Sequence, residues 1–427
     1  MGNAALDKAL AEYAAVGTRY VKALEEKGLV FAEAGAGQAR CAELRAELAA
    51  RGVKVRNAGA SLSVGHLSPA CVECTGNRGS ETFSTTFRCH RDCYFCFNRN
   101  QPDYEKFFHE GCPWEEGLRR SAAENDALAC VGLTGGEPLL DLDNALALLR
   151  RAGELWPGAH KRMYTSGDLL TEESAALLRD AGLDEIRFSV KDDDAPEQQE
   201  RVLAAMALAK RHIPSVMVEM PVIPGAKAHM QDLLRRFEEV GVDGINLLEF
   251  CFPFANWDEF ARRGFTLKNP PFDVMYDYGY SGGLAVAGSE ELILELMAWA
   301  LDEGLALGMH YCSLDNKHRS EMRQKNERAA RVHPCVEFDE GDFFLKTAKV
   351  FGPDVDVARR LLEDAGCRDF MEDAEERSLA FPPRFAGVLA GAARADGEPV
   401  RVMTCSFVYE CEEGGGYLID VALSDAQ

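Results

Sequence analysis

Residues 128–138 read LACVGLTGGEP, an apolar run that ends at a pair of glycines. The segment that follows, 141–155, has apolar residues at helical spacing, so the stretch predicts a strand, a tight turn and a helix. The same alternation of a short apolar run and an amphipathic helix recurs between about residues 80 and 312. Repeated strand–helix units imply parallel strands joined by right-handed crossovers, which is an α/β fold.

Six or seven such units favour a partial (β/α)6 TIM-like barrel over a doubly wound sheet. We expect the barrel at residues 61–312, including an aromatic insertion at 251–288 that either lines a substrate pocket or belongs to the core. An N-terminal helical extension covers 1–60, and a C-terminal α+β element covers 313–427. In such barrels the catalytic residues lie at the carboxyl ends of the strands, so motifs at those positions are candidates for the site.

The composition excludes several classes of protein. The 427 residues include 47 Lys and Arg against 70 Asp and Glu, a net charge of −23, which argues against a nucleic-acid partner. The start of the chain has no basic segment followed by an apolar one, and no apolar run is long enough for a membrane span. We therefore expect a cytoplasmic protein whose 14 cysteines stay reduced. In such proteins clustered cysteines more often hold metal than form disulfides.

A cysteine triplet follows the first predicted strand. Cys89, Cys93 and Cys96 have the spacing Cys-x3-Cys-x2-Cys. Three thiolates in one loop bind three irons of a cubane cluster and leave the fourth iron open. A structural zinc loop with a remote fourth ligand is the alternative, but the position at a strand end favours the cluster. Phe95, just before the third cysteine, is placed to pack beside an adenine.

The glycine pair of residues 128–138 stands at the next strand end. Gly135 and Gly136 lack side chains, which lets the backbone approach a ligand closely. Glu137 then offers an acceptor for an ammonium group. A simple tight turn is the alternative, but the neighbouring cysteine loop favours a ligand site.

These two motifs give the sequence a resemblance to the radical S-adenosylmethionine (SAM) superfamily, over about residues 80–250. The resemblance implies that Cys89, Cys93 and Cys96 hold a [4Fe–4S] cluster whose open iron binds SAM. It also implies that Gly135, Gly136 and Glu137 receive the methionine amine. An electron from a donor such as flavodoxin or ferredoxin would cleave SAM to a 5′-deoxyadenosyl radical, which abstracts a substrate hydrogen under anaerobic conditions.

Later strand ends add further candidates. Thr165 and Ser166 stand where the superfamily often has a Thr-Asn-Gly segment near SAM, and Ser189 is expected at the ribose. Lys191 resembles the strand-end lysine that meets the methionine carboxylate in glycyl-radical-activating members, although a solvated charge is the alternative. Glu219 lies in an apolar run, where a carboxylate is costly unless paired, so it is either catalytic or paired with an arginine. Lys191 and Glu219 are the candidate catalytic residues.

A second cysteine pair lies just ahead of the first predicted strand. Cys71 and Cys74 form a two-thiolate clip that needs further ligands, for which Cys312 and Cys335 are candidates. Together with Lys317, this pattern resembles a subgroup related to pyruvate formate-lyase activating enzyme. We predict a second metal site, either an auxiliary iron–sulfur cluster, a mononuclear iron or a zinc. Unrelated buried thiols are the alternative.

The resemblance leaves the substrate open. Hydrogen abstraction from a peptide or a glycyl-radical protein is the first hypothesis. The alternatives are methylation or rearrangement of a small molecule, and a non-catalytic binding protein stapled by zinc.

Overall fold

The structure is a computed structural model. It describes residues 2–74, 79–191, 194–272, 283–329, 332–412 and 415–426, and every structural statement below refers to these. The chain divides into two compact units. The larger unit comprises Val30–Pro271 and Tyr280–Lys317, and the smaller comprises Met1–Leu29, Phe272–Gly279 and His318–Gln427.

The larger unit is built on a nine-stranded sheet, of which seven neighbouring strands are parallel. In spatial order these are β3 (Ser80–Ser84), β4 (Cys130–Thr134), β5 (His160–Thr165), β6 (Glu185–Phe188), β7 (Ser215–Val222), β8 (Gly244–Glu249) and β11 (Gly308–Cys312). An antiparallel hairpin of β2 (Ser61–Val64) and β1 (Lys54–Arg56) follows β11. The sheet runs from β1 to β3 without closing, so the predicted partial TIM-like α/β barrel is confirmed.

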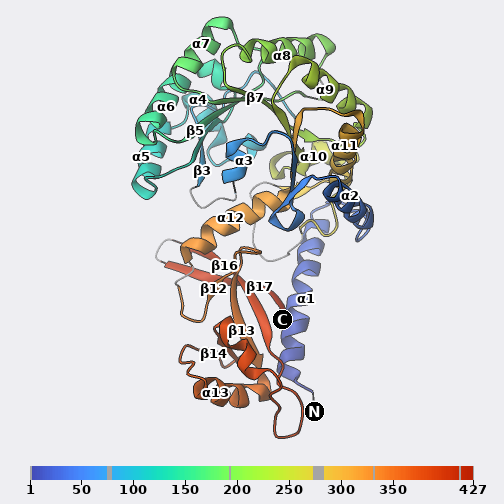
Figure 1. Cartoon of the computed structure of the whole chain (residues 1–427), viewed down its shortest axis with the longest axis vertical. Helices are drawn as coiled ribbons and strands as arrows, with labels where there is room; N and C mark the ends of the chain where they lie inside the picture. Colours follow the sequence, from blue (N-terminus) through green and yellow to red (C-terminus); the bar gives the residue numbers. More distant parts are fainter. Residues whose placement is uncertain are drawn as a thin grey trace. The chain divides into compact units, whose positions relative to one another are not determined.

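Helices cover the outside of this sheet, as Figure 1 shows for α5 to α9. Their bounds are α5 (Trp114–Glu124), α6 (Leu142–Leu155), α7 (Glu172–Asp180), α8 (Pro196–Ala209), α9 (Lys227–Val240) and α11 (Ser289–Glu303). The core between strands and helices includes the fully buried Met163, Ile186 and Leu247. Each such side chain contributes about 1.5–3 kcal/mol by its burial. The sequence also determines where α7 begins, because Thr171 and Ser174 form a capping box at its start.

The register of the parallel strands aligns their carboxyl ends. Ser84 pairs with Thr134, Thr165 with Phe188, and Val222 with Glu249. The loops that follow these strands therefore emerge at one edge of the sheet, where the predicted site residues stand.

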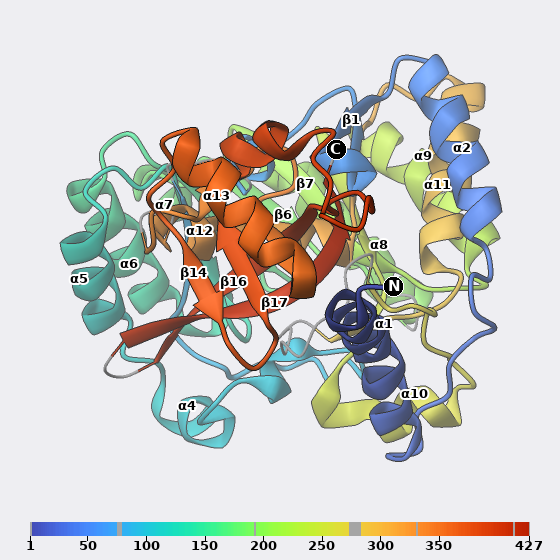
Figure 2. The same ribbon diagram turned by 90° about the horizontal axis from the view of Figure 1, so that it is seen from below.

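The smaller unit contains an antiparallel sheet. Its order is β14 (Met371–Asp373), β15 (Ser378–Phe381), β13 (Leu345–Phe351), β16 (Met403–Glu412) and β17 (Gly415–Asp425), with β12 (Glu337–Phe338) paired to β13. Helix α13 (Val355–Asp364) packs on this sheet, where Ala358 and Leu362 meet Val350 and Leu379. Figure 2 shows α13 lying over the strands. Helix α12 (Leu314–Ala329) begins in the larger unit and continues into the smaller.

The N-terminal segment differs from the predicted extension at 1–60, because its two helices belong to different units. Helix α1 (Ala4–Glu25) packs Leu6 and Ala9 against residues of β13 and β16. Helix α2 (Gln38–Ala50) instead joins the core of the larger unit, beside α11. Both helices have an apolar stripe, and the stripe alone does not say which surface covers it.

The aromatic insertion contributes a two-stranded sheet and a short helix. These are β9 (Cys251–Phe252), β10 (Leu284–Ala285) and α10 (Trp257–Arg262). Its Tyr276, Tyr278 and Tyr280 lie outside the described residues. Among the helices that the structure describes, none is long and apolar enough to cross a membrane.

Candidate active site

The cysteine triplet lies in the loop after β3. Cys89, Cys93 and Cys96 are all partly exposed and line one cavity of about 270 Å³ at the carboxyl edge of the sheet. Burial raises the pKa of the Cys89 thiol to about 11, and the nearby Glu137, Cys93 and Cys96 add to the rise. Three sulfurs facing one cavity are the donor set that a cubane cluster requires.

The glycine pair packs against the backbone that leads into this loop. Gly136 N–H donates to the Thr86 carbonyl at 2.8 Å, and Glu137 N–H donates to the Arg88 carbonyl at 2.8 Å. A Cβ atom at Gly136 would lie 1.9 Å from the Arg88 oxygen, and Gly135 has φ of +104°. These positions thus require glycine because the turn packs closely against the backbone of residues 86–88. Contact of the two glycines with a ligand stays a prediction.

Substitution Gly136→Ala is expected to displace the cysteine loop, because the added Cβ collides with backbone that no rotamer change can move. Overpacking of this kind costs about 1–3 kcal/mol, which thermal unfolding measures. Gly158→Ala is the matched control, since a Cβ there meets nothing within 4 Å. Equal melting temperatures for the two variants would contradict the assigned packing.

Glu137 joins two strand ends that lie 28 residues apart in sequence. The residue as a whole is 1% exposed. Oε1 accepts from Thr165 Oγ1 at 2.7 Å, while Oε2 lies 2.8 Å from Ser166 N and 2.6 Å from Ser166 Oγ. The structure therefore brings together three residues that the sequence analysis selected separately.

Lys191 and Ser189 form the next part of the cavity wall. Lys191 Nζ donates to Ser189 Oγ at 2.6 Å. The lysine is 9% exposed, so the alternative of a solvated charge does not describe it. Its ammonium is held at the cavity by a neighbour from the same strand end.

Aromatic side chains form another part of the cavity wall. Phe95 and Phe250 line the cavity with their rings 6.1 Å apart. The insertion packs on the cysteine loop, where Asn256 Nδ2 donates to the Tyr94 carbonyl at 2.6 Å. Phe252 and Phe260 are buried with ring centroids 4.6 Å apart, so this part of the insertion belongs to the core.

Glu219 is paired with an arginine, which is one of the two alternatives that the sequence analysis gave for it. Arg187 Nη1 donates to Glu219 Oε2 at 2.5 Å, and Asn246 Nδ2 donates to the same oxygen at 2.7 Å. Burial alone would raise the pKa of this carboxyl, but Arg187 and Asn246 hold it below its usual value. Glu219 lines the cavity as an ionised, hydrogen-bonded group, and a catalytic role for it stays a prediction.

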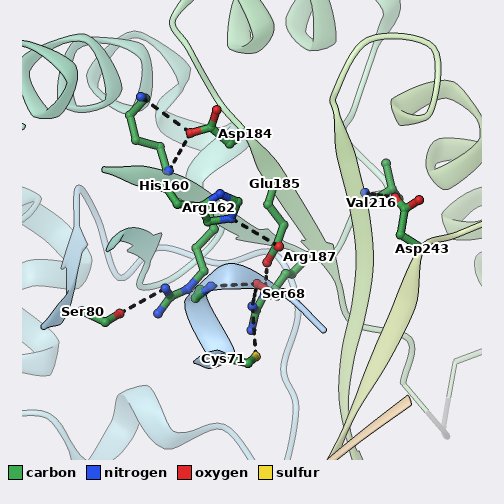
Figure 3. Close-up of polar contacts among 12 residues, drawn as sticks. Ser68, Cys71, Ser80, His160, Arg162, Asp184, Glu185, Arg187, Val216 and Asp243 are labelled. Carbon is green, nitrogen blue, oxygen red and sulfur yellow. Dashed lines mark hydrogen bonds and ion pairs between the residues drawn. The ribbon is translucent and has the colours of Figure 1, made fainter. Parts of the chain in front are cut away.

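Arg187, which the sequence analysis did not select, is the centre of this buried network, and Figure 3 shows its contacts with Ser68, Cys71 and Glu185. Besides Glu219, it donates to Glu185 at 2.5 Å and to Ser68 Oγ at 2.9 Å, and it lies 3.4 Å from Cys71 Sγ. The only signal in the sequence was a charged residue inside the apolar run of β6. Such a residue has to be paired when the strand is buried.

Cys71, Cys74 and Cys312 are neighbours in the larger unit. Burial raises the pKa of the Cys312 thiol to about 12, and the nearby Cys74 and Cys71 add to the rise. Burial would also raise the pKa of Cys71, but Arg187 and His310 lower it to about 6. Within the described part of the chain, no three His, Cys, Asp or Glu side chains converge as ligands of a single metal ion.

Cys335 is the fourth candidate ligand of the predicted second site. It belongs to the smaller unit and is fully buried there, with Sγ 3.9 Å from the Ala380 carbonyl. Its part in that site stays a prediction. Cys335 matches the alternative of a core thiol.

Comparison with known proteins relates this chain to a protein family. Residues 83–237, from β3 to α9, match the family model described as the radical SAM superfamily. The chain carries a radical SAM domain. It is accordingly a radical SAM enzyme, and the family implies SAM and a [4Fe–4S] cluster as its cofactors. The matched region contains Cys89, Cys93, Cys96 and Glu137, so the residues lining the cavity fit the group that the family implies.

This radical SAM protein is similar to a curated protein and to several solved structures. It is 27% identical over 332 residues to a Methanocaldococcus jannaschii protein named as a glycyl-radical enzyme activating enzyme, covering 74% of this chain and 79% of that protein. Streptococcus suis SuiB bound to its precursor peptide is 18% identical with a TM-score of 0.32, over 40% of this chain and 38% of that one. Escherichia coli coproporphyrinogen III oxidase is 14% identical with a TM-score of 0.35, over 65% and 66%. The matched part is thus less than two thirds of each solved structure.

Proposed function

We propose that this protein cleaves SAM reductively at a cluster held by Cys89, Cys93 and Cys96, and abstracts hydrogen from a peptide or glycyl-radical protein. The observation that carries the proposal is the cavity itself. Three thiols, the Glu137 turn and Lys191 line one space at the carboxyl edge of the sheet. The name of the Methanocaldococcus jannaschii relative supports a polypeptide as the substrate.

The chain's own residues would bind and orient SAM. When bound, the cluster supplies one electron for cleavage of SAM and a coordination position for its methionine group. Glu137 accepts the ammonium, Lys191 pairs with the carboxylate and Ser189 meets the ribose. Phe95 offers an apolar ring to the adenine.

The surroundings of the site follow from this chemistry. An open iron is destroyed by oxygen, so we propose that the protein works in an anaerobic or well-protected cytoplasm. Its electron would come from a small reductant such as flavodoxin or ferredoxin. Neither nucleic acid nor a membrane has a part in the proposed reaction.

We also propose a second metal site at Cys71, Cys74 and Cys312. The low pKa of Cys71, about 6, favours a thiolate ligand at neutral pH. The metal would be an auxiliary iron–sulfur cluster, a mononuclear iron or a zinc.

Anaerobic reconstitution with iron and sulfide tests the main proposal. We expect a brown protein that forms 5′-deoxyadenosine from SAM with dithionite, and forms it faster when a polypeptide substrate is added. A colourless zinc protein without SAM cleavage would contradict the proposal and favour a binding protein. Acceleration by a small molecule instead of a polypeptide would move the substrate to the other class.

A further inference from the structure

One hydroxyl group stands between two carboxylates beside the proposed SAM site. Ser166 Oγ lies 2.6 Å from Glu137 Oε2 and 2.7 Å from Asp168 Oδ1. A serine hydroxyl carries a single proton, so it donates to one carboxylate at a time. When this hydroxyl donates to Asp168, Glu137 Oε2 accepts one hydrogen bond fewer.

Asp168 is tied to the cysteine loop from the other side. Its side chain is 10% exposed, and His90 Nε2 lies 2.9 Å from both of its oxygens. Arg91 Nη1 is 3.8 Å away, and Gln198 Nε2 donates to Oδ2 at 2.7 Å. Both residues that directly follow Cys89 thus contact one carboxylate.

The charge state of Asp168 agrees with this arrangement. Burial would raise the pKa of Asp168, but the hydrogen bonds from Ser166 and His90 keep it below its usual value. Asp168 is therefore an ionised acceptor at neutral pH and competes with Glu137 for the Ser166 proton.

We propose that Asp168 is a positioning residue for SAM. It draws the Ser166 proton away from Glu137, which leaves Glu137 Oε2 as an acceptor for the ammonium of the bound SAM. Through His90 and Arg91 it also fixes the cysteine loop relative to Glu137. This inference rests on the proposed function, because it assumes that Glu137 receives the ammonium.

The geometry predicts the result of Asp168→Asn. Gln198 donates to the Oδ2 position, so the amide oxygen of the asparagine stays there and its NH2 group faces Ser166. The Ser166 hydroxyl then accepts from this amide and donates to Glu137, which occupies the acceptor. We expect the Kd of SAM to rise about tenfold or more, because a hydrogen bond to a charged group typically contributes that factor to affinity.

The test measures SAM binding to the reconstituted enzyme by equilibrium dialysis, with iron content determined for each variant. Iron content should stay at the wild-type level in Asp168→Asn, while the change that SAM causes in the EPR spectrum of the reduced cluster weakens. The double variant Ser166→Ala/Asp168→Asn should bind SAM more tightly than Asp168→Asn, because it has no Ser166 hydroxyl that could donate to Glu137. Asp180→Asn, at the exposed end of α7, is the matched control.

Two results would overturn the inference: wild-type SAM affinity in Asp168→Asn, or no recovery in the double variant. A separate measurement on the apoprotein needs no cofactor. Hydrogen exchange of residues 88–97 should be faster in Asp168→Ala than in the wild type, and equal rates would refute the anchoring role. If the wild type holds no cluster and cleaves no SAM, the proposed function fails, whereas this exchange experiment still decides the role of Asp168.

Discussion

Replacement of Cys89, Cys93 and Cys96 together by alanine should abolish formation of 5′-deoxyadenosine. The three thiols are the only protein ligands that we assign to the cluster, and the cavity brings them together. Without them no electron reaches SAM, so the rate should fall to the uncatalysed level, a loss of about 10⁶-fold or more. Anaerobic product analysis by chromatography checks the activity, and the loss of the brown absorbance checks the cluster.

The same variant examines the second metal site. Metal that remains after removal of the three cysteines should belong to Cys71, Cys74 and Cys312, and the further change Cys71→Ala should release it. A protein free of metal after the first three substitutions would refute the second site. Cys112→Ala is the control for cysteine loss as such, because Cys112 is partly exposed and is not among the cavity residues.

The sequence was sufficient to predict the barrel and the edge of its sheet at which the candidate site residues lie. Strand–helix alternation is a local pattern, and the parallel register brings every strand end to one edge of the sheet. This rule alone predicts that Glu137, Thr165 and Ser166 lie near one another, and their hydrogen bonds agree with it. A local motif and a general property of the fold were enough for these residues.

The residues that the sequence analysis missed act through distant partners. Arg187 lies in the short run of β6, whose pattern indicates a strand, while its partner Ser68 is 119 residues away. Asp168 follows the Thr165–Gly167 turn as an ordinary loop residue, and its importance comes from His90 and Gln198. The packing of α1 and α2 in different units has the same cause. An apolar stripe specifies that a surface is covered, but not by what.

Substitution Arg187→Met should strongly destabilise the larger unit. The Arg187 side chain is 3% exposed and pairs with Glu185 and Glu219, which lie in β6 and β7. Its removal leaves two carboxylates in the barrel interior without their cation. Breaking a buried ion pair in this way costs about 3–5 kcal/mol. Denaturant unfolding at pH 7 measures the loss.

Arg162→Met is the matched control for Arg187. Arg162 is also buried, in the neighbouring strand β5, but its hydrogen bonds go to Tyr164 and Ser80 rather than to a carboxylate. Its loss removes hydrogen bonds without leaving a buried anion, so a smaller destabilisation of about 1–3 kcal/mol is expected. Equal losses in the two variants would show that the ion pairs do not determine the effect.

The pH dependence separates a charge effect from a packing effect. In the wild type, burial would raise the pKa of Glu185, but Arg187 and the other partners lower it to about 2. The stabilisation from this shift is present above the unfolded pKa near 4.5 and is lost as the pH falls toward 2. In Arg187→Met the largest interaction that opposes burial is gone, so the pKa of Glu185 rises above its wild-type value. Protonation of Glu185 then reduces the destabilisation of the variant as the pH falls. The difference in unfolding free energy between wild type and variant should therefore be largest near pH 7 and shrink toward pH 4, whereas a pure packing defect would leave it constant.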